Sequence, residues 1–219
     1  MAPFDPALRD GLNEAAAALG LALPTEHADA LLGYLALLQR WNGTYNLTAV
    51  REPLQMLTLH LADCLALVAP LRRHLGVRPG ARLLDVGSGA GLPGVVIAAL
   101  NPSIAVTCVE TVGKKAAFIQ QVAAELGLPN LSSAHARVER LNAAPFDVVS
   151  SRAFASLPGF VTLTRALLAP GGAWLAMKGK RPDDELTRLA SDIDVFHVEP
   201  LTVPGLSAER CLVWMRLRG

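Results

Sequence analysis

The chain has 219 residues, of which 52% are hydrophobic and 18% charged, and its formal net charge at pH 7 is +1. This length predicts one domain with an extension. Folding would bury about 70% of the surface of the unfolded chain, so the hydrophobic core can stabilise the domain without a metal ion or disulfide bond. A net charge this small neither favours nor excludes nucleic acid, so any basic surface has to be local. Cys64, Cys108 and Cys211 lie far apart in apolar surroundings, which predicts buried free thiols in a reducing compartment. With no signal peptide or membrane span in the pattern, we expect a cytoplasmic protein.

Three helices are predicted ahead of the first strand. We assign them to a helical extension at residues 1–75, before a second region at 76–219. The expected helices are 5–20, 24–43 and 52–70. They start at Asp5-Pro6, Pro24-Thr25 and Glu52-Pro53, and Pro70 is expected to end the third helix. The polar and aromatic segment 41–48 is expected to be a loop. His60 and Asp63 lie on one helix face, which predicts a hydrogen bond between them rather than a metal site.

From residue 82 onward, short apolar runs alternate with helix-compatible segments. The expected strands are 83–86, 105–110, 132–136, 146–151, 173–177, 195–198 and 211–217, and the expected helices are 95–100, 114–126, 158–168 and 182–190, with a turn at 171–172. Alternation of this kind predicts a parallel sheet with right-handed crossovers, and the last two strands predict a closing antiparallel hairpin. The fold class is therefore α/β, with a Rossmann-like seven-stranded sheet.

The stretch from Arg82 to Gly94 ends an apolar run in three glycines at alternate positions, Gly87, Gly89 and Gly91. A strand, a tight loop and a helix in this order form the first β-α unit of a nucleotide-binding sheet. Glycine is needed because a Cβ would hold a cofactor away from the backbone amides and because the turn requires positive φ. An ordinary strand-to-helix turn is the alternative interpretation.

Two acids accompany this loop. Asp85 lies at the strand end, where a carboxylate is costly unless it binds something. Glu110 lies 19 residues after Gly91, near the ~20 expected for an acid that accepts hydrogen bonds from ribose hydroxyls. The two acids favour a cationic ligand such as S-adenosylmethionine, and Glu110 disfavours NADP. The G-x-G-x-G spacing is one residue shorter than the dinucleotide fingerprint, and the stretch resembles motif I of S-adenosylmethionine-dependent methyltransferases.

The residues that follow each predicted strand indicate the rest of the site, because ligands bind at the carboxyl ends of such strands. The backbone and carboxylate of Val138-Glu139 are expected to reach an adenine edge. Cations after the fourth and fifth strands predict a phosphate-binding patch, with solvated helix starts as the alternative. The candidate RNA contacts are Arg137, Lys178, Lys180 and Arg181, and the candidates for positioning an acceptor are Arg152, Lys178 and Asn46.

Two motifs are missing from the sequence, and their absence narrows the chemistry. No Asp/Asn-Pro-Pro-aromatic motif follows the fourth strand, and no Pro-Cys occurs at the rim of the sheet. The site therefore suits an acceptor that is already nucleophilic, such as guanine N7, which needs proximity and orientation but no catalytic acid or base. In duplex RNA that edge lies in a deep, narrow groove, so an unpaired guanine is expected. Trp41, Tyr45 and Phe154 are candidates for stacking on it.

Five stretches together are similar to one family. They are Trp41-Asn42 with Tyr45-Asn46-Leu47-Thr48, His60-x-x-Asp63, Asp85 to Gly94, Ser151-Arg152-Ala153-Phe154-Ala155, and Met177-Lys178-Gly179. From about residue 30 to the C-terminus the chain resembles the bacterial RsmG family, also called glucose-inhibited division protein B. The resemblance implies methylation of a guanine N7 in a 16S rRNA hairpin loop near the decoding centre. The donor would be S-adenosyl-L-methionine, the product S-adenosyl-L-homocysteine, and the substrate the small ribosomal subunit or a late assembly precursor.

The resemblance also suggests which residues hold the cofactor. It carries over Gly87, Leu92, Val138, Glu139 and Arg152. With the loop and its acids, the predicted cofactor-binding set is Asp85, Gly87, Ser88, Gly89, Gly91, Leu92, Glu110, Val138, Glu139 and Arg152. Neither a metal nor a catalytic acid or base is required, and we expect a monomer that contacts no membrane. Two alternatives stay open at this point: an NAD-dependent oxidoreductase, disfavoured by the glycine spacing and the closing hairpin, and a non-catalytic assembly factor that binds the cofactor and rRNA.

Overall fold

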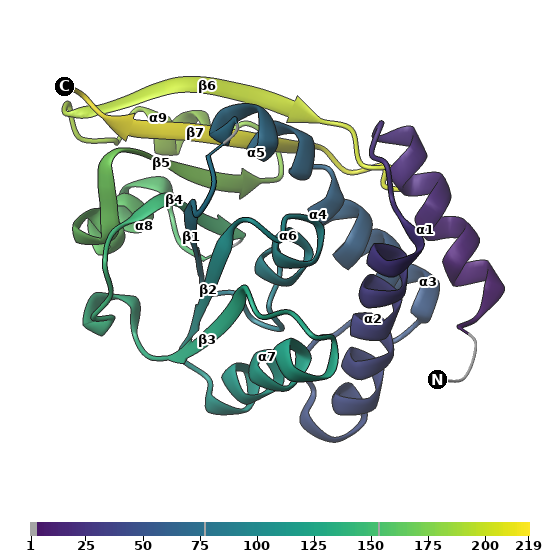
Figure 1. Ribbon diagram of the computed structural model, residues 1–219. Helices are drawn as coiled ribbons and strands as arrows, with labels where there is room; N and C mark the ends of the chain where they lie inside the picture. The colour runs from purple at the N-terminus through teal and green to yellow at the C-terminus, as the bar shows by residue number, and fades with distance from the viewer. Residues whose placement is uncertain (1–3, 77, 153) are drawn as a thin grey trace.

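The computed structural model describes residues 4–76, 78–152 and 154–219 (Figure 1). Residues 1–3 of the predicted extension and Ala153 of the Ser151–Ala155 stretch lie outside this description. The first helix, α1 (Pro6–Ala18), begins where predicted, because the Asp5 carboxylate accepts a hydrogen bond from the Ala7 amide (2.9 Å) and proline follows at the first helical position.

Helix α2 (Thr25–Tyr45) runs further than expected, so the prediction of a loop over 41–48 is wrong for its first five residues. Trp41 packs against Phe118 with 5.4 Å between ring centroids, and Asn42 is buried. These contacts offset the loss of helix stability caused by Gly43, which is about 1 kcal/mol relative to alanine. The helix ends at Asn46, which takes a left-handed conformation with φ of 50°.

The third predicted helix is built from four pieces: α3 (Pro53–Met56), the π-helical turn η1 (Leu57–Ala62), α4 (Asp63–Leu65) and α5 (Val68–Leu75). The prediction that Pro70 ends this helix is wrong. Pro70 lies in the first turn of α5, where a missing N–H costs little. The stretch Pro53–Leu75 is long and apolar enough to span a membrane by length and composition. However, 67% of its most apolar window is buried within the molecule, as in a core helix.

The seven-stranded sheet is confirmed, with the order β3-β2-β1-β4-β5-β7-β6. Its strands are β1 (Arg82–Val86), β2 (Ala105–Glu110), β3 (Leu131–His135), β4 (Phe146–Arg152), β5 (Leu168–Lys178), β6 (Ile193–Leu201) and β7 (Arg210–Leu217). The first five are parallel, and β7 pairs antiparallel with both β5 and β6, which confirms the closing hairpin. The carboxyl ends of β1, β4 and β5 and the amino end of β7 therefore lie at one edge of the sheet.

Helices cover both faces of the sheet (Figure 1). On one face lie α6 (Gly94–Leu100), α7 (Gly113–Glu125) and the N-terminal helices. On the other lie α8 (Leu157–Thr164) with its 3₁₀ extension η3 (Arg165–Leu167), and α9 (Asp183–Leu186). The short 3₁₀ turn η2 (Val138–Arg140) follows β3.

Two predicted elements on the second face differ from expectation. Gly171-Gly172 lies within the bounds of β5, at a bulge where residues 169–172 leave the ladder between the pair of Phe146 with Leu168 and that of Val148 with Ala173, and Gly171 has φ of +73°. A Cβ at Gly172 would lie 2.9 Å from the Ala169 carbonyl oxygen and 3.0 Å from that of Asp147, so glycine permits the close approach of β4 and β5. The helix expected over 182–190 has four residues, because Thr187 Oγ1 and Arg188 Nε occupy the Asp184 carbonyl that a longer helix would use.

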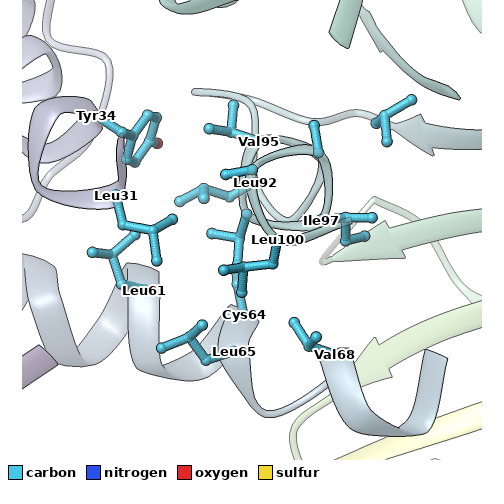
Figure 2. Close-up of a cluster of buried hydrophobic side chains, with 14 of the residues drawn as sticks. Leu31, Tyr34, Leu61, Cys64, Leu65, Val68, Leu92, Val95, Ile97 and Leu100 are labelled. Carbon is cyan, nitrogen blue, oxygen red and sulfur yellow. The ribbon is translucent and has the colours of Figure 1, made fainter. Parts of the chain in front are cut away.

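The N-terminal helices share one hydrophobic core with the sheet. Figure 2 shows Leu31 and Tyr34 of α2, and Leu61, Cys64, Leu65 and Val68 of the third helical stretch, facing Leu92, Val95, Ile97 and Leu100. All three cysteines are free and buried, as predicted. Because the extension packs directly on α6, it can position the loop that precedes α6.

Candidate cofactor and acceptor site

A cavity of about 540 Å³ opens above the carboxyl ends of β1, β4 and β5. Six of the predicted site residues line it: Gly87, Ser88, Gly89, Leu92, Arg152 and Lys178. The rest of its wall is formed by Leu47, Thr48, Leu59, His60, Asp63, Ala90, Met177, Gly179 and Arg210. The glycine loop, the N-terminal helices and the closing hairpin therefore meet at one site, which we call the cofactor cavity.

Each glycine of the loop has a different physical role. Gly87 has φ of +64°, and a Cβ there would lie 2.6 Å from the Phe154 ring. Gly89, with φ of +57°, has open space where a Cβ would point, so its requirement is conformational. Gly91 does not line the cavity, because a Cβ at this position would point into the core, 2.7 Å from Val95. The core contacts show why glycine is needed at position 91, and contact between Gly91 and a cofactor stays a prediction.

Glu110 ties the glycine loop to the end of β2. Its Oε2 accepts a hydrogen bond from the Gly89 amide (2.8 Å), and its Oε1 accepts one from the Val112 amide (2.9 Å). The side chain is buried and does not belong to the cavity wall. Oε1 also accepts a hydrogen bond from the Thr111 hydroxyl (3.3 Å). A carboxylate has about four lone-pair sites, so about one remains for a ribose hydroxyl. Contact between Glu110 and the ribose stays a prediction.

Tyr34 supports the same loop from the helical extension, and the sequence analysis missed it. Its hydroxyl donates a hydrogen bond to the Ala90 carbonyl oxygen (2.9 Å), and the side chain is fully buried (Figure 2). Burial raises the pKa of Tyr34 well above its ordinary value, so it remains a donor. A tyrosine on the apolar stripe of Leu31, Leu35 and Leu38 was the available signal, because a buried tyrosine hydroxyl usually finds a partner.

Asp85 lies beneath the described wall of the cavity, and its contact with a cofactor stays a prediction. It is fully buried, and its Oδ2 accepts a hydrogen bond from the Gly94 amide at the start of α6 (2.9 Å). Its Oδ1 accepts one from the Ser150 hydroxyl (3.3 Å). Burial raises the pKa of Asp85 to about 7, although these hydrogen bonds and the Arg152 charge oppose the shift. Asp85 therefore joins β1, β4 and α6 under the loop.

A buried ion cluster forms one wall of the cavity. Asp63 pairs with Arg152 (Oδ2 to Nη1, 3.1 Å) and with Arg210 (Oδ1 to Nε, 2.8 Å). The prediction of a His60–Asp63 hydrogen bond is wrong, because both Asp63 oxygens accept from arginines and His60 Nε2 pairs with Thr48 Oγ1 (3.1 Å). Burial and the Arg152 charge lower the pKa of His60, which keeps it neutral at pH 7.

Arg210 was also missed from the sequence. It is the first residue of β7, and an antiparallel strand begins at the sheet edge where its parallel neighbours end. The predicted hairpin was therefore the signal that could have placed it beside Arg152.

Lys178 is already engaged at the cavity rim. Its Nζ donates to both oxygens of Glu185 (2.9 and 3.1 Å) and to the Ala155 carbonyl (3.1 Å), which accounts for all three ammonium hydrogens. Glu185 also accepts from the Leu157 amide. Lys178 thus fixes the segment after β4 that brings Phe154 against Gly87, a role different from the predicted phosphate contact.

The remaining candidates divide into two groups. Lys180 and Arg181 are exposed beside Lys178, and Arg181 pairs with Asp183 (2.7 Å). Arg137, Val138 and Glu139 follow β3, which is separated from β5 by three strands, or about 19 Å at ordinary strand spacing. Arg137 is exposed there and is not brought together with the other cations.

Three side chains of the 41–48 segment also differ from expectation. Asn46 is exposed and accepts a hydrogen bond from Arg51 (2.7 Å), and it is absent from the described cavity wall. Trp41 is half-buried on Phe118, whereas Tyr45 is 43% exposed on the outer side of Trp41, with 5.0 Å between the two rings. Of these aromatic residues, Tyr45 is the one available for stacking.

The described cavity residues fit S-adenosylmethionine. The loop offers backbone at Gly87 and Gly89 that a Cβ would block or strain, and Ser88 Oγ is buried without a hydrogen-bond partner in the described chain. The amino-acid end of this cofactor carries a carboxylate and an ammonium, which match the guanidinium and carboxylate groups of Arg152 and Asp63. No group of histidine, cysteine and acidic side chains with the arrangement of a metal site occurs among the residues described.

The architecture and the glycine-loop cavity define the class, an S-adenosylmethionine-dependent methyltransferase. The fold is similar to that of the N-methyltransferase NodS from Bradyrhizobium japonicum WM9, crystallised with S-adenosyl-L-homocysteine (TM-score 0.59, 15% identity, 83% of this chain and 100% of that chain). It is also similar to TrmN from Thermus thermophilus (TM-score 0.55, 20% identity, 69% and 48%). At these identities the likeness shows the fold alone.

Sequence comparison identifies the family. The model of the GidB family, rRNA small subunit methyltransferase G, matches residues 27–213. Relatives named Ribosomal RNA small subunit methyltransferase G are 61% identical in Acidovorax sp. (strain JS42), over 97% of this chain and 95% of the relative, and 62% identical in Leptothrix cholodnii, over 96% of each. The chain belongs to this family, whose known activity is methylation of a guanine N7 in 16S rRNA, and the predicted resemblance is confirmed.

Proposed function

We propose that this chain transfers a methyl group from S-adenosyl-L-methionine to N7 of a guanine in a 16S rRNA hairpin loop near the decoding centre. The substrate is the small ribosomal subunit or a late assembly precursor in the cytoplasm, and the enzyme acts as a monomer. The observation that carries the proposal is a cavity at the glycine loop whose described wall holds two arginines fixed by the single carboxylate of its lining, Asp63.

The state of the titratable side chains in the wall supports an acceptor that needs no deprotonation. Each oxygen of Asp63 accepts from an arginine. His60 is neutral, its Nε2 pairs with Thr48, and its Nδ1, which has no partner among the described residues, is buried away from the cavity surface. The lone pair of guanine N7 lies in the ring plane and carries no proton. The work left to the protein is therefore to hold donor and acceptor in line at close range.

The chain's own residues supply this positioning. The bound cofactor supplies an electrophilic methyl group. The backbone of Gly87 to Gly89 and the Arg152 guanidinium would hold its amino-acid end, while Glu110, Val138 and Glu139 would face its adenosine. The apolar side chains of Leu47, Leu59 and Met177 line the same cavity and would face the acceptor base.

A direct assay tests the function. Wild-type protein is incubated with tritiated S-adenosylmethionine and small subunits from cells lacking this enzyme, and the rRNA is then treated with borohydride and aniline, which cleave at N7-methylguanine. One labelled, cleavable site is expected. Label without cleavage would discard N7, and cofactor binding with no label would support an assembly factor without turnover.

Arg152→Ala tests the assignment of the cofactor-holding cation. Loss of hydrogen bonds between charged groups costs about 1.5–3 kcal/mol, so we expect affinity for S-adenosylmethionine to fall about 10- to 100-fold by titration calorimetry. Arg181→Ala is the matched control, because this exposed arginine pairs with Asp183 outside the cofactor cavity. Unchanged affinity in a folded Arg152→Ala protein would contradict the assignment.

A further inference from the structure

A second cavity of about 290 Å³ lies between the segment after β5 and the β6–β7 hairpin. Its rim carries Lys180, Arg181 and Arg210, with Glu209 as the one acid of its described lining. Its floor is apolar and comes from the two hairpin strands. We call it the hairpin cavity.

The hairpin cavity adjoins the cofactor cavity. Gly179 and Arg210 line both, so whatever leaves the cofactor cavity on this side enters the hairpin cavity directly. A chain whose acceptor base occupied the first cavity would have its neighbouring nucleotide at the second.

The other exit from the acceptor position is electrostatically unsuited to RNA. The cavity on the α9 side of Lys178 is lined by three carboxylates, and the cations there are partly paired. Phosphates would meet Asp183, Asp184 and Glu185 on that route. Lys180 and Arg181 line both cavities, but the described lining of the hairpin cavity contains one acid, Glu209, against three on the α9 side. The hairpin side therefore opposes a polyanion less and is the favoured path.

The floor of the hairpin cavity suits a base or ribose. Pro200 lies opposite Cys211 in the β6–β7 pairing, and Val198 lies two residues earlier on the same strand, so their side chains share one face of the sheet. At the rim, Lys180 is exposed and forms no ion pair within the described residues, whereas Arg210 is held by Asp63. The floor holds no aromatic side chain among the described lining residues, so a base or ribose would rest on it by apolar contact while its phosphate meets the cationic rim.

We propose that the hairpin cavity binds the nucleotide directly next to the methylated guanine, with its base or ribose on the apolar floor and its phosphate at Lys180. The inference rests on the proposed function and adds a specific place for the RNA strand. Binding of this neighbour offsets part of the cost of unstacking the target guanine.

Separate variants test the rim and the floor. Affinity for unmethylated small subunits and for protein-free 16S rRNA is measured by filter binding from 50 to 200 mM KCl. Lys180→Gln should reduce the slope of log K against log salt by about 0.7, the value for one phosphate contact on a single strand. Val198→Asn should weaken binding about three- to tenfold without changing the slope. Arg216→Gln, at the far end of β7, is the charge-matched control and should match wild type.

Several outcomes would overturn the inference. Equal slopes of log K against log salt for Lys180→Gln and Arg216→Gln would contradict the assignment of a phosphate contact to Lys180. If the variants bind the assembled subunit more weakly but bind protein-free rRNA as wild type does, the hairpin cavity contacts a ribosomal protein instead of RNA. Ultraviolet crosslinking with mass spectrometry should join a peptide containing Lys180 to a nucleotide adjacent to the methylated guanine, and a crosslink several nucleotides away would contradict the placement.

Two controls separate this inference from the proposed function. Affinity for S-adenosylmethionine should match wild type in all three variants, which shows that the cofactor site is intact. The unfolding midpoint should match wild type in Lys180→Gln, whereas Val198→Asn, at a residue packed against the core, should have a lower midpoint but remain folded at the assay temperature. Wild-type methyl transfer with no defect in any variant would overturn the hairpin cavity alone, whereas absence of methyl transfer by wild type would overturn the function.

Discussion

Asp63 and Asp85 are both buried carboxyl groups beside the cofactor cavity, but their neighbours differ in charge. Asp63 lies between the guanidinium groups of Arg152 and Arg210. Asp85 is surrounded by uncharged donors, the Gly94 amide and the Ser150 hydroxyl, and by apolar core. The desolvation of a buried carboxylate is therefore compensated by paired charges at Asp63, whereas at Asp85 the direct contacts are hydrogen bonds from uncharged donors.

The difference separates two tasks within one site. The region around Asp63 orders cations in the cavity wall, joining the N-terminal helices to the ends of β4 and β7. Asp85 forms no ion pair among the described residues and instead fixes the start of α6 under the glycine loop. Charge faces the ligand in the first region, and neutral hydrogen bonding supports the backbone in the second.

Asp63→Asn should produce the largest effect. Removing the carboxylate leaves two guanidinium groups close together without their counter-ion, and breaking a buried pair in this way costs about 3–5 kcal/mol. We expect a decrease of this size in the free energy of unfolding, measured by urea denaturation. Asp183→Asn removes an exposed partner of Arg181 and should cost no more than about 1 kcal/mol. Equal costs for the two variants would contradict the comparison.

Asp85→Asn should change how stability depends on pH. The pKa of Asp85 is about 7 in the folded protein against an ordinary value of 3.8, so the folded state holds a proton that the unfolded state has released. Raising the pH from 5 to 7 therefore destabilises wild type relative to Asp85→Asn, by about 1 kcal/mol per pH unit, and this loss levels off about one unit above the folded pKa. Parallel unfolding curves for the two proteins across this range would show that Asp85 is ionised throughout.

The sheet could be predicted from the sequence because its strands are short apolar runs separated by glycine loops and amphipathic helices. The elements that were wrong depend on tertiary contacts. Trp41 extends α2 by packing on Phe118, and the carbonyl of Asp184 is captured by side chains that end α9 early. Neither contact has a local sequence pattern.

The site could be predicted in outline for a similar reason. Residues that follow parallel strands meet at one edge, so the loop, Arg152 and Lys178 were expected together and line one cavity. Pairing could not be predicted, because a sequence does not show which acid a lysine will meet. Glu185 neutralises Lys178, and Arg210 takes the Asp63 oxygen that was expected to bind His60.

Tyr34→Phe tests whether a neutral hydrogen bond supports the loop as Asp85 does. Without the hydroxyl, the Ala90 carbonyl loses its donor and the loop must be ordered when the cofactor binds. One such bond is worth about 1 kcal/mol, so affinity for S-adenosylmethionine should fall about fivefold by calorimetry. Thr164→Val removes a buried hydroxyl on α8, on the other face of the sheet, and should lower stability without changing this affinity. Unchanged affinity in Tyr34→Phe would reduce Tyr34 to a packing residue.

Lys178→Met should have the smallest effect on cofactor affinity. It also distinguishes Lys178, whose ammonium group is ion-paired, from Lys180, which is proposed to bind phosphate. The side chains of Lys178 and Glu185 are partly exposed, so their pair contributes no more than about 1 kcal/mol. Losing it frees the segment that holds Phe154 against Gly87, and cofactor affinity should fall about threefold, equally in Lys178→Met and Glu185→Gln. Because its ammonium group is already occupied, Lys178→Met should leave the salt slope of RNA binding unchanged, unlike Lys180→Gln. A slope reduced in Lys178→Met but not in Glu185→Gln would instead place a phosphate on Lys178.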